Sequence, residues 1–492
     1  MHVQRVAVIG AGPCGLGVAK YLLAEQKFKE VTIFEQRDQP GGVWNYTGDE
    51  GLENAAAEPR PRPSQQPQKD VKGTFPSPVY DALETNIPNS MMQFIDMPFP
   101  LGTSLFPPHE VVKEYLHKYA EELLPLIRFQ SLILDVQLKT QHPHAEWIVT
   151  WRDLKTTETL SAQFDAVIVA NGHHNDPYIP DIAGLTQWTQ VFPGSIIHSA
   201  SYRRPESFSN KVSRFPLPPP QPHTQITAEN YCCRSFSLGN RYRNPDRESL
   251  KAPVVDLRAD RDHSPPEKAA FAENVPEISS LDPINRVVKF IDGREERDVD
   301  HIVFCTGYHF SVPFLSKLHP SIVTDGVRPH QLYRHVFYKK EPTLALIGFP
   351  QRIVPFPFSQ AQGAWVARVL SGRVSLPSEV EMDQWISHWT EIRGDGRSFN
   401  TLAFPLDADY INSLHELSST AVLKDGLENE GRGRSSPYWG EKEKWTRARF
   451  PLIKKASQAL GDQRSRVKSL EELGFNFEKE TGQNVDVSNA RL

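Results

Sequence analysis

The sequence predicts an α/β fold built on parallel strands, and three observations support this. Residues 3–9 have the branched apolar pattern of a buried strand, residues 15–26 have helical spacing, and VTIFEQ at 31–36 is typical of the next parallel strand. Further apolar runs next to glycine predict buried strands at residues 164–172, 301–308 and 342–350. The length of 492 residues allows two to four domains, or one large domain with another inserted in it.

The remaining segments predict helices and two irregular stretches. Residues 109–124 and 360–370 carry apolar side chains at helical spacing, and beyond about residue 375 the pattern is helical and polar. Residues 47–78 are rich in Pro, Gln, Glu and Ala, a composition that cannot bury a core, so we expect a mobile surface loop. Residues 205–266 show neither the helical nor the strand spacing of apolar residues, and PLPPPQPH within them is close to polyproline.

Composition and cysteine usage narrow the class of protein. Hydrophobic residues make up 39% of the chain, enough for a packed core, and the formal net charge of −5 suggests no nucleic-acid partner. Cys14, Cys232, Cys233 and Cys305 form neither a zinc-binding spacing nor a disulfide framework, so we expect no metal and a reducing compartment. Without a leader, a long apolar run or an apolar C-terminus, a cytoplasmic protein with no membrane anchor is expected.

The first predicted strand runs into a glycine motif. Gly10, Gly12 and Gly15 form G-x-G-x-x-G between the strand and the helix. The first glycine permits a tight turn, the second lets the backbone approach a pyrophosphate, and the third lets helix and strand pack closely. The helix N-terminus offers unpaired N–H groups to phosphates, and Glu35 at the end of the second strand can accept hydrogen bonds from a ribose. These residues predict a dinucleotide site without separating FAD from NAD.

A pair of glycines follows the second strand. QPGGVWNY at 39–46 contains Gly41, Gly42 and Trp44, and adjacent glycines let the backbone come close to something flat or charged. On residue types alone, an ordinary turn with a core tryptophan is the simpler interpretation.

Taken together, several separated blocks resemble the flavin-containing monooxygenases over most of the chain. GAGPCGL and FEQRDQPGGVWNY resemble the FAD site of that family, and YDALETNIPNSMMQFIDMPFP resembles its segment near the flavin ring. FPPHEVVKEYLHKYA, FCTGY, LYRHVFYKKEPTLALIGFP and VPFPFSQAQGAWVARVLSG resemble later family blocks. FPGSIIHSASY fits the fingerprint F-x-G-x-x-x-H-x-x-x-Y through Phe192, Gly194, His198 and Tyr202.

The resemblance implies two Rossmann-like domains, with an NADPH-binding domain inserted in an FAD-binding domain. The FAD-binding domain would comprise residues 1–182 and 301–492, and the inserted domain residues 183–300. The implied cofactors are FAD and NADPH. The implied FAD contacts are Gly10, Gly12, Pro13, Cys14, Gly15, Glu35, Gly42, Val43, Trp44, Thr85, Asn86, Ile87 and Gln362.

Four residues of the matching blocks have competing interpretations. The resemblance places Asn86 near the flavin N5 as the catalytic residue, whereas residue types alone indicate an Asn in a turn before a proline. Gln362 would approach the flavin, or instead cap or solvate its helix. His198 is expected to position the two domains rather than transfer a proton. Cys14 lies at a helix N-terminus that can lower a thiol pKa, but packing is the expected role.

The reaction follows from the family as well. NADPH reduces FAD, the reduced flavin captures O2 as a C4a-hydroperoxide, and a small-molecule nucleophile with a soft nitrogen or sulfur takes one oxygen atom. The cofactor carries the difficult chemistry, and the protein positions it and excludes water.

The sequence departs from the family where its second G-x-G-x-x-[GS] should open the NADPH site. Between Arg203 and Ser249 the only glycine is Gly239. The prolines at 216, 218, 219, 220 and 222 each remove a ladder donor, so a central strand is expected to be impossible here. Residues 205–250 are therefore anomalous, and the NADPH site is expected to be damaged. Either residues 213–249 come from a retained intron or similar error in the gene model, which we favour, or the divergence is real. Arg258, after the resemblance resumes, would meet the NADPH 2′-phosphate.

Three alternative functions stay open at this stage. A Baeyer–Villiger oxygenase is disfavoured because those enzymes usually carry Trp where Tyr202 stands, and a disulfide-reductase-like enzyme is disfavoured because no C-x-x-C or C-x4-C occurs. A flavoprotein with little or no NADPH-dependent activity is the third reading, and the damaged second site supports it.

Overall fold

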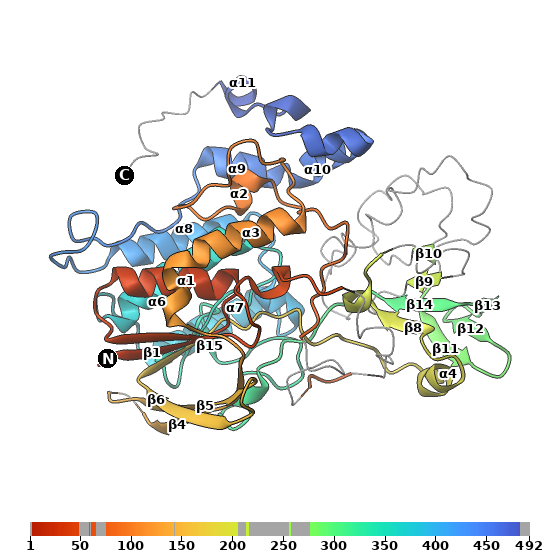
Figure 1. Ribbon diagram of the computed structural model, residues 1–492, viewed down its shortest axis with the longest axis horizontal. Helices are drawn as coiled ribbons and strands as arrows, with labels where there is room; N and C mark the ends of the chain where they lie inside the picture. Colours follow the sequence, from red (N-terminus) through yellow and green to blue (C-terminus); the bar gives the residue numbers. More distant parts are fainter. Residues whose placement is uncertain are drawn as a thin grey trace.

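The computed structural model describes residues 2–48, 59, 61–64, 75–141, 143–204, 213–215, 255–256 and 276–482. Its larger part is built on a seven-stranded sheet in the order β15-β16-β17-β7-β1-β2-β3 (Figure 1). The five strands β17 (Leu344–Leu346), β7 (Ala166–Val169), β1 (Arg5–Ile9), β2 (Glu30–Phe34) and β3 (Ile127–Arg128) are parallel. The last two strands on one side of the sheet, β16 (Phe337–Tyr338) and β15 (Leu332–Tyr333), are antiparallel. This confirms the α/β class and four of the expected strands.

Both faces of this sheet are buried, and alternate residues of each strand serve different cores. In β1, Val6 and Val8 belong to the core on the helical side, and Ala7 and Ile9 belong to the core on the other side. In Figure 1 the helices lie above the sheet and a small sheet lies below it. This two-sided burial explains why the strands appear in the sequence as nearly continuous apolar runs.

The helical layer consists of long helices packed closely on one another. These are α1 (Pro13–Ala24), α3 (His109–Ala120), α6 (Pro355–Leu370), α7 (Glu379–Arg393) and α8 (Leu406–Ser419). A Cβ atom on Gly363 of α6 would come within 2.9 Å of the Val18 Cα of α1, so only glycine allows the two helices this distance. Helices were expected at these places, although α6 begins five residues earlier than the predicted range.

The sheet on the opposite side was not predicted. It is an antiparallel meander of β4 (Ser131–Thr140), β5 (Glu146–Asp153) and β6 (Thr159–Phe164). In β5, Trp147, Val149 and Trp151 are buried while the residues between them are not. Polar Glu146, Thr150 and Arg152 alternate with these buried residues, and this alternation, interrupted at Ile148, is the sequence signal that could have found the sheet.

A smaller unit contains a second parallel sheet, in the order β10-β9-β14-β8. Its strands are β8 (Ile196–His198), β9 (Ser213–Phe215), β10 (Val255–Asp256) and β14 (His301–Phe304). Helix α4 (Leu185–Val191) and an antiparallel sheet of β11 (Ile278–Asp282), β12 (Val287–Phe290) and β13 (Glu295–Arg297) complete it. Trp188 and Phe304 are fully buried in its core.

Two expectations about this unit need correction. A central strand does form in the anomalous stretch, because β9 pairs with both β10 and β14, but it ends at Phe215 immediately before Pro216. Residues 301–304, expected to start the second part of the FAD-binding domain, form β14 and pair with β8. By sheet membership the inserted unit therefore extends past residue 300, and the full domain division stays a proposal. The prolines from 216 to 222, Gly239 and Arg258 lie outside the described residues.

The C-terminal part is helical, as expected. It contains α9 (Glu441–Ala448), α10 (Phe450–Ala459) and α11 (Phe477–Thr481), and the short helix α2 (Asn89–Met92) lies nearer the N-terminus. Short 3₁₀ turns occur at Gly42–Trp44, Glu121–Leu126, Ser199–Ser201, Pro313–Leu315, Arg397–Asn400, Gly461–Arg466 and Glu471–Leu473. Within the described part of the chain, no helix combines the length and apolar character needed to cross a membrane.

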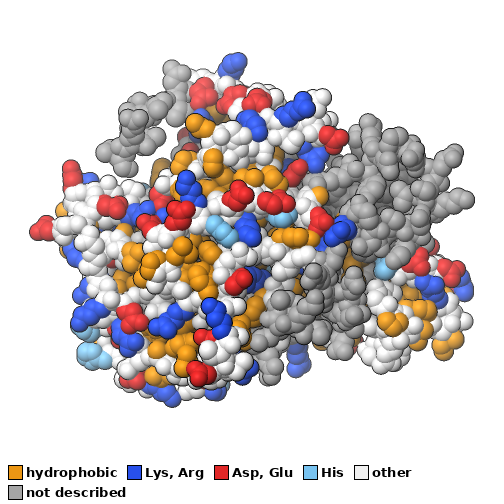
Figure 2. All heavy atoms as spheres, in the orientation of Figure 1, with side chains coloured by type: hydrophobic (Ala, Val, Ile, Leu, Met, Phe, Trp, Pro, Cys, Tyr) orange, Lys and Arg blue, Asp and Glu red, His pale blue; other side chains and the backbone are white. Residues whose placement is uncertain are grey.

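The surface shows acidic and basic side chains close together. On the face shown in Figure 2, Lys and Arg alternate with Asp and Glu over the larger part. Of the predicted loop at 47–78, residues 49–58, 60 and 65–74 lie outside the described residues. Ser64 within it is described, and its backbone N–H donates to Asp176 Oδ2 at 2.6 Å.

Candidate active site

One cavity of about 900 Å³ lies where the carboxyl ends of both parallel sheets meet. Gly10 follows β1, Ala170 follows β7 and Gly348 follows β17, while Ser199 and Cys305 follow strands of the smaller sheet. Ligands of open α/β sheets bind at this edge, and the volume is within the range of cofactor sites.

The glycines form a cradle that a larger residue would fill. Gly10 has φ +107°, and a Cβ there would meet the Ala170 carbonyl oxygen at 2.5 Å. A Cβ on Gly15 would stand 1.8 Å from the Gly10 carbonyl oxygen, so this position must be glycine for helix α1 to pack on β1. Gly42 has φ +59°, and its Cβ would stand 3.0 Å from Gly12 Cα. Gly10, Gly12 and Gly42 line the cavity. Gly15 is not among the lining residues, and its role is to let α1 pack on β1.

Glu35 lies on the cavity wall and also holds the glycine turn. Its carboxylate accepts hydrogen bonds from the N–H of Ala11 at 2.8 Å and from the N–H of Arg37 at 2.9 Å. Burial raises its pKa above the ordinary value, while the nearby Arg37 opposes that shift. Two oxygens with about four lone pairs leave acceptor capacity for a ribose hydroxyl on the cavity side.

Cys14 packs closely against the turn that follows β17. It lines the cavity together with Pro13, and burial raises the pKa of its thiol to about 12, so it is protonated. A Cβ on Gly348 would lie 2.3 Å from Cys14 Sγ, which shows how closely the two pack. A protonated, enclosed thiol is not a nucleophile.

Asn86 and Ile87 line the cavity together with Val43 and Trp44. Thr85 does not reach the cavity. Its hydroxyl donates to the Ile87 carbonyl at 2.9 Å, and its own carbonyl accepts from Lys454 Nζ at 2.7 Å. Thr85 therefore orients the segment that carries Asn86.

Gln362 does not face the cavity, which corrects both interpretations of it. The side chain is fully buried, its Oε1 accepts from the Gly348 N–H at 2.8 Å, and its Nε2 donates to Tyr410 Oη at 3.0 Å. Gln362 thus positions the Gly348 turn, which itself lines the cavity.

The Phe192–Tyr202 fingerprint joins the two units, in line with the positioning role expected for His198. His198 ends β8, its Nδ1 accepts from the Ala200 N–H at 3.1 Å, and its ring lies 5.2 Å from Tyr308. Tyr202 is buried and packs on Tyr80 of the larger part, with ring centroids 5.6 Å apart.

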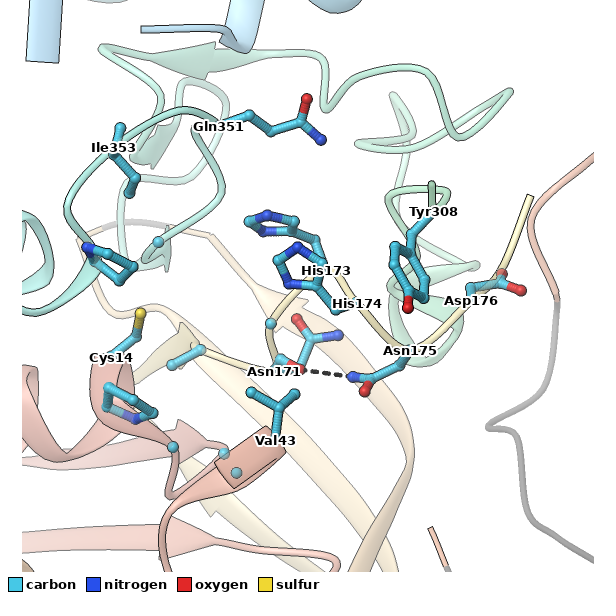
Figure 3. Close-up of a pocket in the computed structure, with 18 of the residues that line it drawn as sticks. Cys14, Val43, Asn171, His173, His174, Asn175, Asp176, Tyr308, Gln351 and Ile353 are labelled. Carbon is cyan, nitrogen blue, oxygen red and sulfur yellow. Dashed lines mark hydrogen bonds between the residues drawn. The ribbon is translucent and has the colours of Figure 1, made fainter. Parts of the chain in front are cut away.

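Several wall residues were missed from the sequence. The turn after β7 contributes Asn171, His173 and His174, and Asn175 Nδ2 donates to the Asn171 carbonyl at 3.1 Å (Figure 3). Burial lowers the pKa of His173 to about 4, so it is a neutral ring. Figure 3 shows the two histidines between the Asn171 turn and Gln351. The only signal was ANGHHND after a buried strand, because turns at this edge carry function in such sheets.

Three helices begin at the cavity. Pro13 of α1, Pro355 and Phe356 of α6, and Phe450 and Pro451 of α10 all line it, and none of these helices has a side-chain cap at its N-terminus. Uncapped helix N-termini favour negative charge. The cavity is therefore suited to an anionic or polyphosphate ligand.

A family model described as flavin-binding monooxygenase-like matches residues 68–214 and 276–428, which is more than half of the chain. The chain belongs to this family. A second model, an NAD(P)-binding Rossmann-like domain, matches residues 8–57, where the glycine cradle lies. The flavin-binding match stops at residue 214 and resumes at 276, so the gap in it covers most of the anomalous residues 205–250.

Known proteins similar to this monooxygenase cover nearly all of it. Flavin-containing monooxygenase ustF2 of Aspergillus flavus is 28% identical and covers 91% of this chain and 98% of its own. The thiol-specific monooxygenase of Saccharomyces cerevisiae is 30% identical over 86% of this chain and 87% of its own. The structure of S-allyl-L-cysteine S-oxygenase from Allium sativum superposes with a TM-score of 0.72 at 26% identity, covering 96% and 98% of the two chains.

The cofactors of this monooxygenase family are FAD and NADPH, and the cavity fits FAD. The cradle around Gly12 and Gly42 excludes side chains where a pyrophosphate must approach the backbone, Glu35 lies beside it, and Asn86 lies on the wall of the same cavity. Within the described residues, no group of three or more His, Cys, Asp or Glu side chains is arranged to hold a metal ion.

Proposed function

We propose that the protein transfers one oxygen atom of O2 to a soft nucleophile, with sulfur favoured over nitrogen. The observation that carries this proposal is the cavity that contains both the glycine cradle and Asn86. The relatives named for thiol and S-allyl-L-cysteine oxygenation favour sulfur. Bound FAD, reduced by two electrons from NADPH, supplies the activation of O2, of which one atom enters the substrate and the other leaves as water.

The residues of this chain hold, orient and dehydrate the reacting groups. Gly10, Gly12, Gly42 and the N-terminus of α1 would bind the pyrophosphate, and Glu35 the ribose. The N-terminus of α6, with Pro355 at its first position, would favour negative charge on a reduced ring system. These roles are electrostatic and positional, which is how proteins tune such cofactors.

Asn86 is the residue proposed to act at the reacting atoms. Its amide has two donors and one acceptor oxygen, so it can hydrogen-bond to a bound oxygen species and to the nicotinamide amide. Thr85 and Lys454 fix the backbone before it, through the bonds to Ile87 and to the Thr85 carbonyl. A fixed amide that needs no reorganisation is the favourable arrangement for stabilising developing charge.

A second candidate function is a flavoprotein with little NADPH-driven activity. Its support is that β9 ends at Phe215 before Pro216, with no glycine in the sequence until Gly239. Under this alternative, FAD stays bound but micromolar NADPH fails to bleach it anaerobically within minutes. Bleaching within seconds would contradict this alternative and leave the monooxygenase proposal intact.

The reaction type is tested with three probes. FAD-loaded protein reduced by light and then mixed with air-saturated buffer should convert methyl p-tolyl sulfide to its sulfoxide. N,N-Dimethylaniline should give less N-oxide, and cyclohexanone should give no lactone. Reduction by light removes the dependence on NADPH. Lactone as the main product would favour a Baeyer–Villiger oxygenase, and hydrogen peroxide without organic product would contradict the proposal.

A further inference from the structure

Helix α10 presents one continuous face to the cavity. Phe450, Pro451, Lys454, Lys455 and Gln458 line it, at positions that recur every three to four residues. Such spacing places them on a single stripe of a helix. The stripe starts apolar, with buried Phe450, and becomes cationic and polar farther along the helix.

This stripe lies next to the proposed catalytic residue. Lys454 Nζ donates to the carbonyl of Thr85 at 2.7 Å, and Asn86 follows directly in the chain. The same contact region is secured by Arg464, whose Nε bonds to Glu84 Oε2 at 3.0 Å, and by the Leu105 N–H, which donates to the Val467 carbonyl at 2.8 Å. Helix α10 therefore forms the part of the cavity wall beside the segment that carries Asn86.

The charge of this wall is only partly compensated. Arg447 also lines the cavity, but its Nε pairs with buried Asp407 at 2.7 Å. In the described part of the chain, four cationic residues of α9 and of the segments next to α10 form ion pairs: Lys442, Arg447, Arg449 and Arg464. Lys455 is in none of these pairs and is exposed at the cavity.

Acidic side chains line the cavity elsewhere. Among the described lining residues the acids are Glu35, beside the glycine cradle, and Asp176, which accepts from the Ser64 N–H. The uncapped N-terminus of α10 adds partial positive charge at Phe450. A neutral nucleophile gains nothing from this field, whereas an anionic group on the same molecule does.

The wall also lies outside the part of the chain that defines the family. The flavin-binding match ends at residue 428, before α9 and α10 begin. A segment that closes the reaction site but is not part of the family pattern is where substrate choice can differ between members.

We propose that Lys455, with Lys454 beside it, binds an anionic group of the substrate, so that the enzyme selects sulfur nucleophiles that carry a carboxylate. This rests on the proposed function, because it assigns the substrate class of the same cavity. Lys454 holds Thr85 and adds charge, while Lys455 makes the contact. The phosphates of NADPH are the other source of anionic groups, and the experiment separates them.

The test uses two thioethers that differ in the charged group, 3-(methylsulfanyl)propanoate and 3-(methylsulfanyl)propanol. Their dissociation constants are measured with oxidised, FAD-loaded full-length protein from the change in flavin absorbance, which requires neither NADPH nor oxygen transfer. We expect the acid to bind about tenfold more tightly than the alcohol, the ratio that about 1.4 kcal/mol gives. Lys455→Gln should weaken binding of the acid about fivefold, and Lys455→Glu should weaken it more. Neither substitution should change binding of the alcohol.

The control is Lys444→Gln on α9, which removes a lysine that does not line the cavity and should change neither constant. NADP⁺ is titrated in parallel and should bind Lys455→Gln as it binds the parent. Equal binding of acid and alcohol to the parent would overturn the proposal. A loss of NADP⁺ affinity without loss of acid affinity would also overturn it and assign the lysine to the dinucleotide. Sulfoxide formation from a neutral sulfide in either case would leave the proposed function standing.

Discussion

Gly12 and Gly42, from two successive turns of the larger sheet, approach so closely that a Cβ on Gly42 would stand 3.0 Å from Gly12 Cα. The contact joins the first glycine motif to the second, and both residues line the cavity. The two turns therefore act as a single cradle, in which each glycine leaves space for the other.

Gly42→Ala should weaken FAD binding by at least tenfold. The residue has φ +59°, which strains alanine, and the added methyl group would press on the Gly12 turn. The ratio of bound flavin to protein after dialysis measures the effect. Gly48→Ala is the matched control, because no non-neighbouring atom of the described residues lies within 4 Å of a Cβ there. Equal flavin retention in the two variants would contradict the cradle.

Asn86→Ala should keep FAD but lose oxygen transfer. The residue lines the cavity, and its removal leaves the glycine cradle untouched. We expect at least a tenfold fall in sulfoxide formed per reduced flavin, with hydrogen peroxide in its place, as for loss of one preorganised hydrogen-bond donor. Chromatography of the sulfoxide and a peroxide assay give both quantities. Unchanged sulfoxide yield would remove Asn86 from the reaction.

Gln362→Leu should destabilise the protein by about 1–3 kcal/mol, because the buried Gly348 N–H and Tyr410 hydroxyl each lose a partner. Flavin affinity should fall as well, since Gly348 lines the cavity. Urea unfolding and flavin titration measure the two effects. Tyr410→Phe, which keeps the Gly348 bond, should affect stability while sparing flavin affinity. Flavin affinity equal to that of the parent in Gln362→Leu would show that the Gly348 turn does not depend on this residue.

The free energy of unfolding should decrease as the pH falls, and protonation of His335 should account for part of the decrease. This buried ring contacts Asn400 at 2.8 Å, and burial lowers its pKa to about 4. The unfolded chain binds the proton near pH 6.5, so between about pH 6.5 and 4 the unfolded state holds more protons and stability is lost as pH falls. At pH 5 this amounts to about 2 kcal/mol, at 1.36 kcal/mol per pH unit.

The measurement is the urea midpoint at pH 7.5 and pH 5.0. His335→Asn, which tolerates the left-handed backbone at this position, should show a smaller drop than the parent. His173 contributes in the same direction, whereas the raised pKa values of Glu35 and Asp407 act oppositely, so the comparison between variant and parent carries the test. The exposed His388→Asn serves as control. An equal drop in parent and His335→Asn would contradict this role.

The sequence predicted the structure best at positions where the backbone geometry allows only a few residue types. The glycine turn, Glu35 and the buried parallel strands could be predicted because close approach and two-sided burial restrict the residues allowed. The pairing of β14 with β8 could not, since both sheets use the same apolar strand pattern. Sequence pattern identifies a buried strand but not the sheet it joins.

The roles of single polar residues were harder to predict than the site itself. Gln362 and Asn86 both lie in blocks that resemble the flavin side of the family, yet only Asn86 reaches the cavity, because helix α6 turns Gln362 toward Gly348. Lys455 carried no motif at all. Its position follows from the way the C-terminal helices close the cavity, which no local pattern encodes.

The activity that we propose for this chain is oxygen transfer from O2 to a sulfur nucleophile at the cavity beside Asn86. The most direct measurement is a single turnover of light-reduced, FAD-loaded protein with ¹⁸O2 and methyl p-tolyl sulfide, followed by mass spectrometry of the sulfoxide. We expect sulfoxide labelled with one ¹⁸O atom, and far less of it from Asn86→Ala. Unlabelled sulfoxide, or flavin reoxidation that yields hydrogen peroxide without sulfoxide, would contradict it.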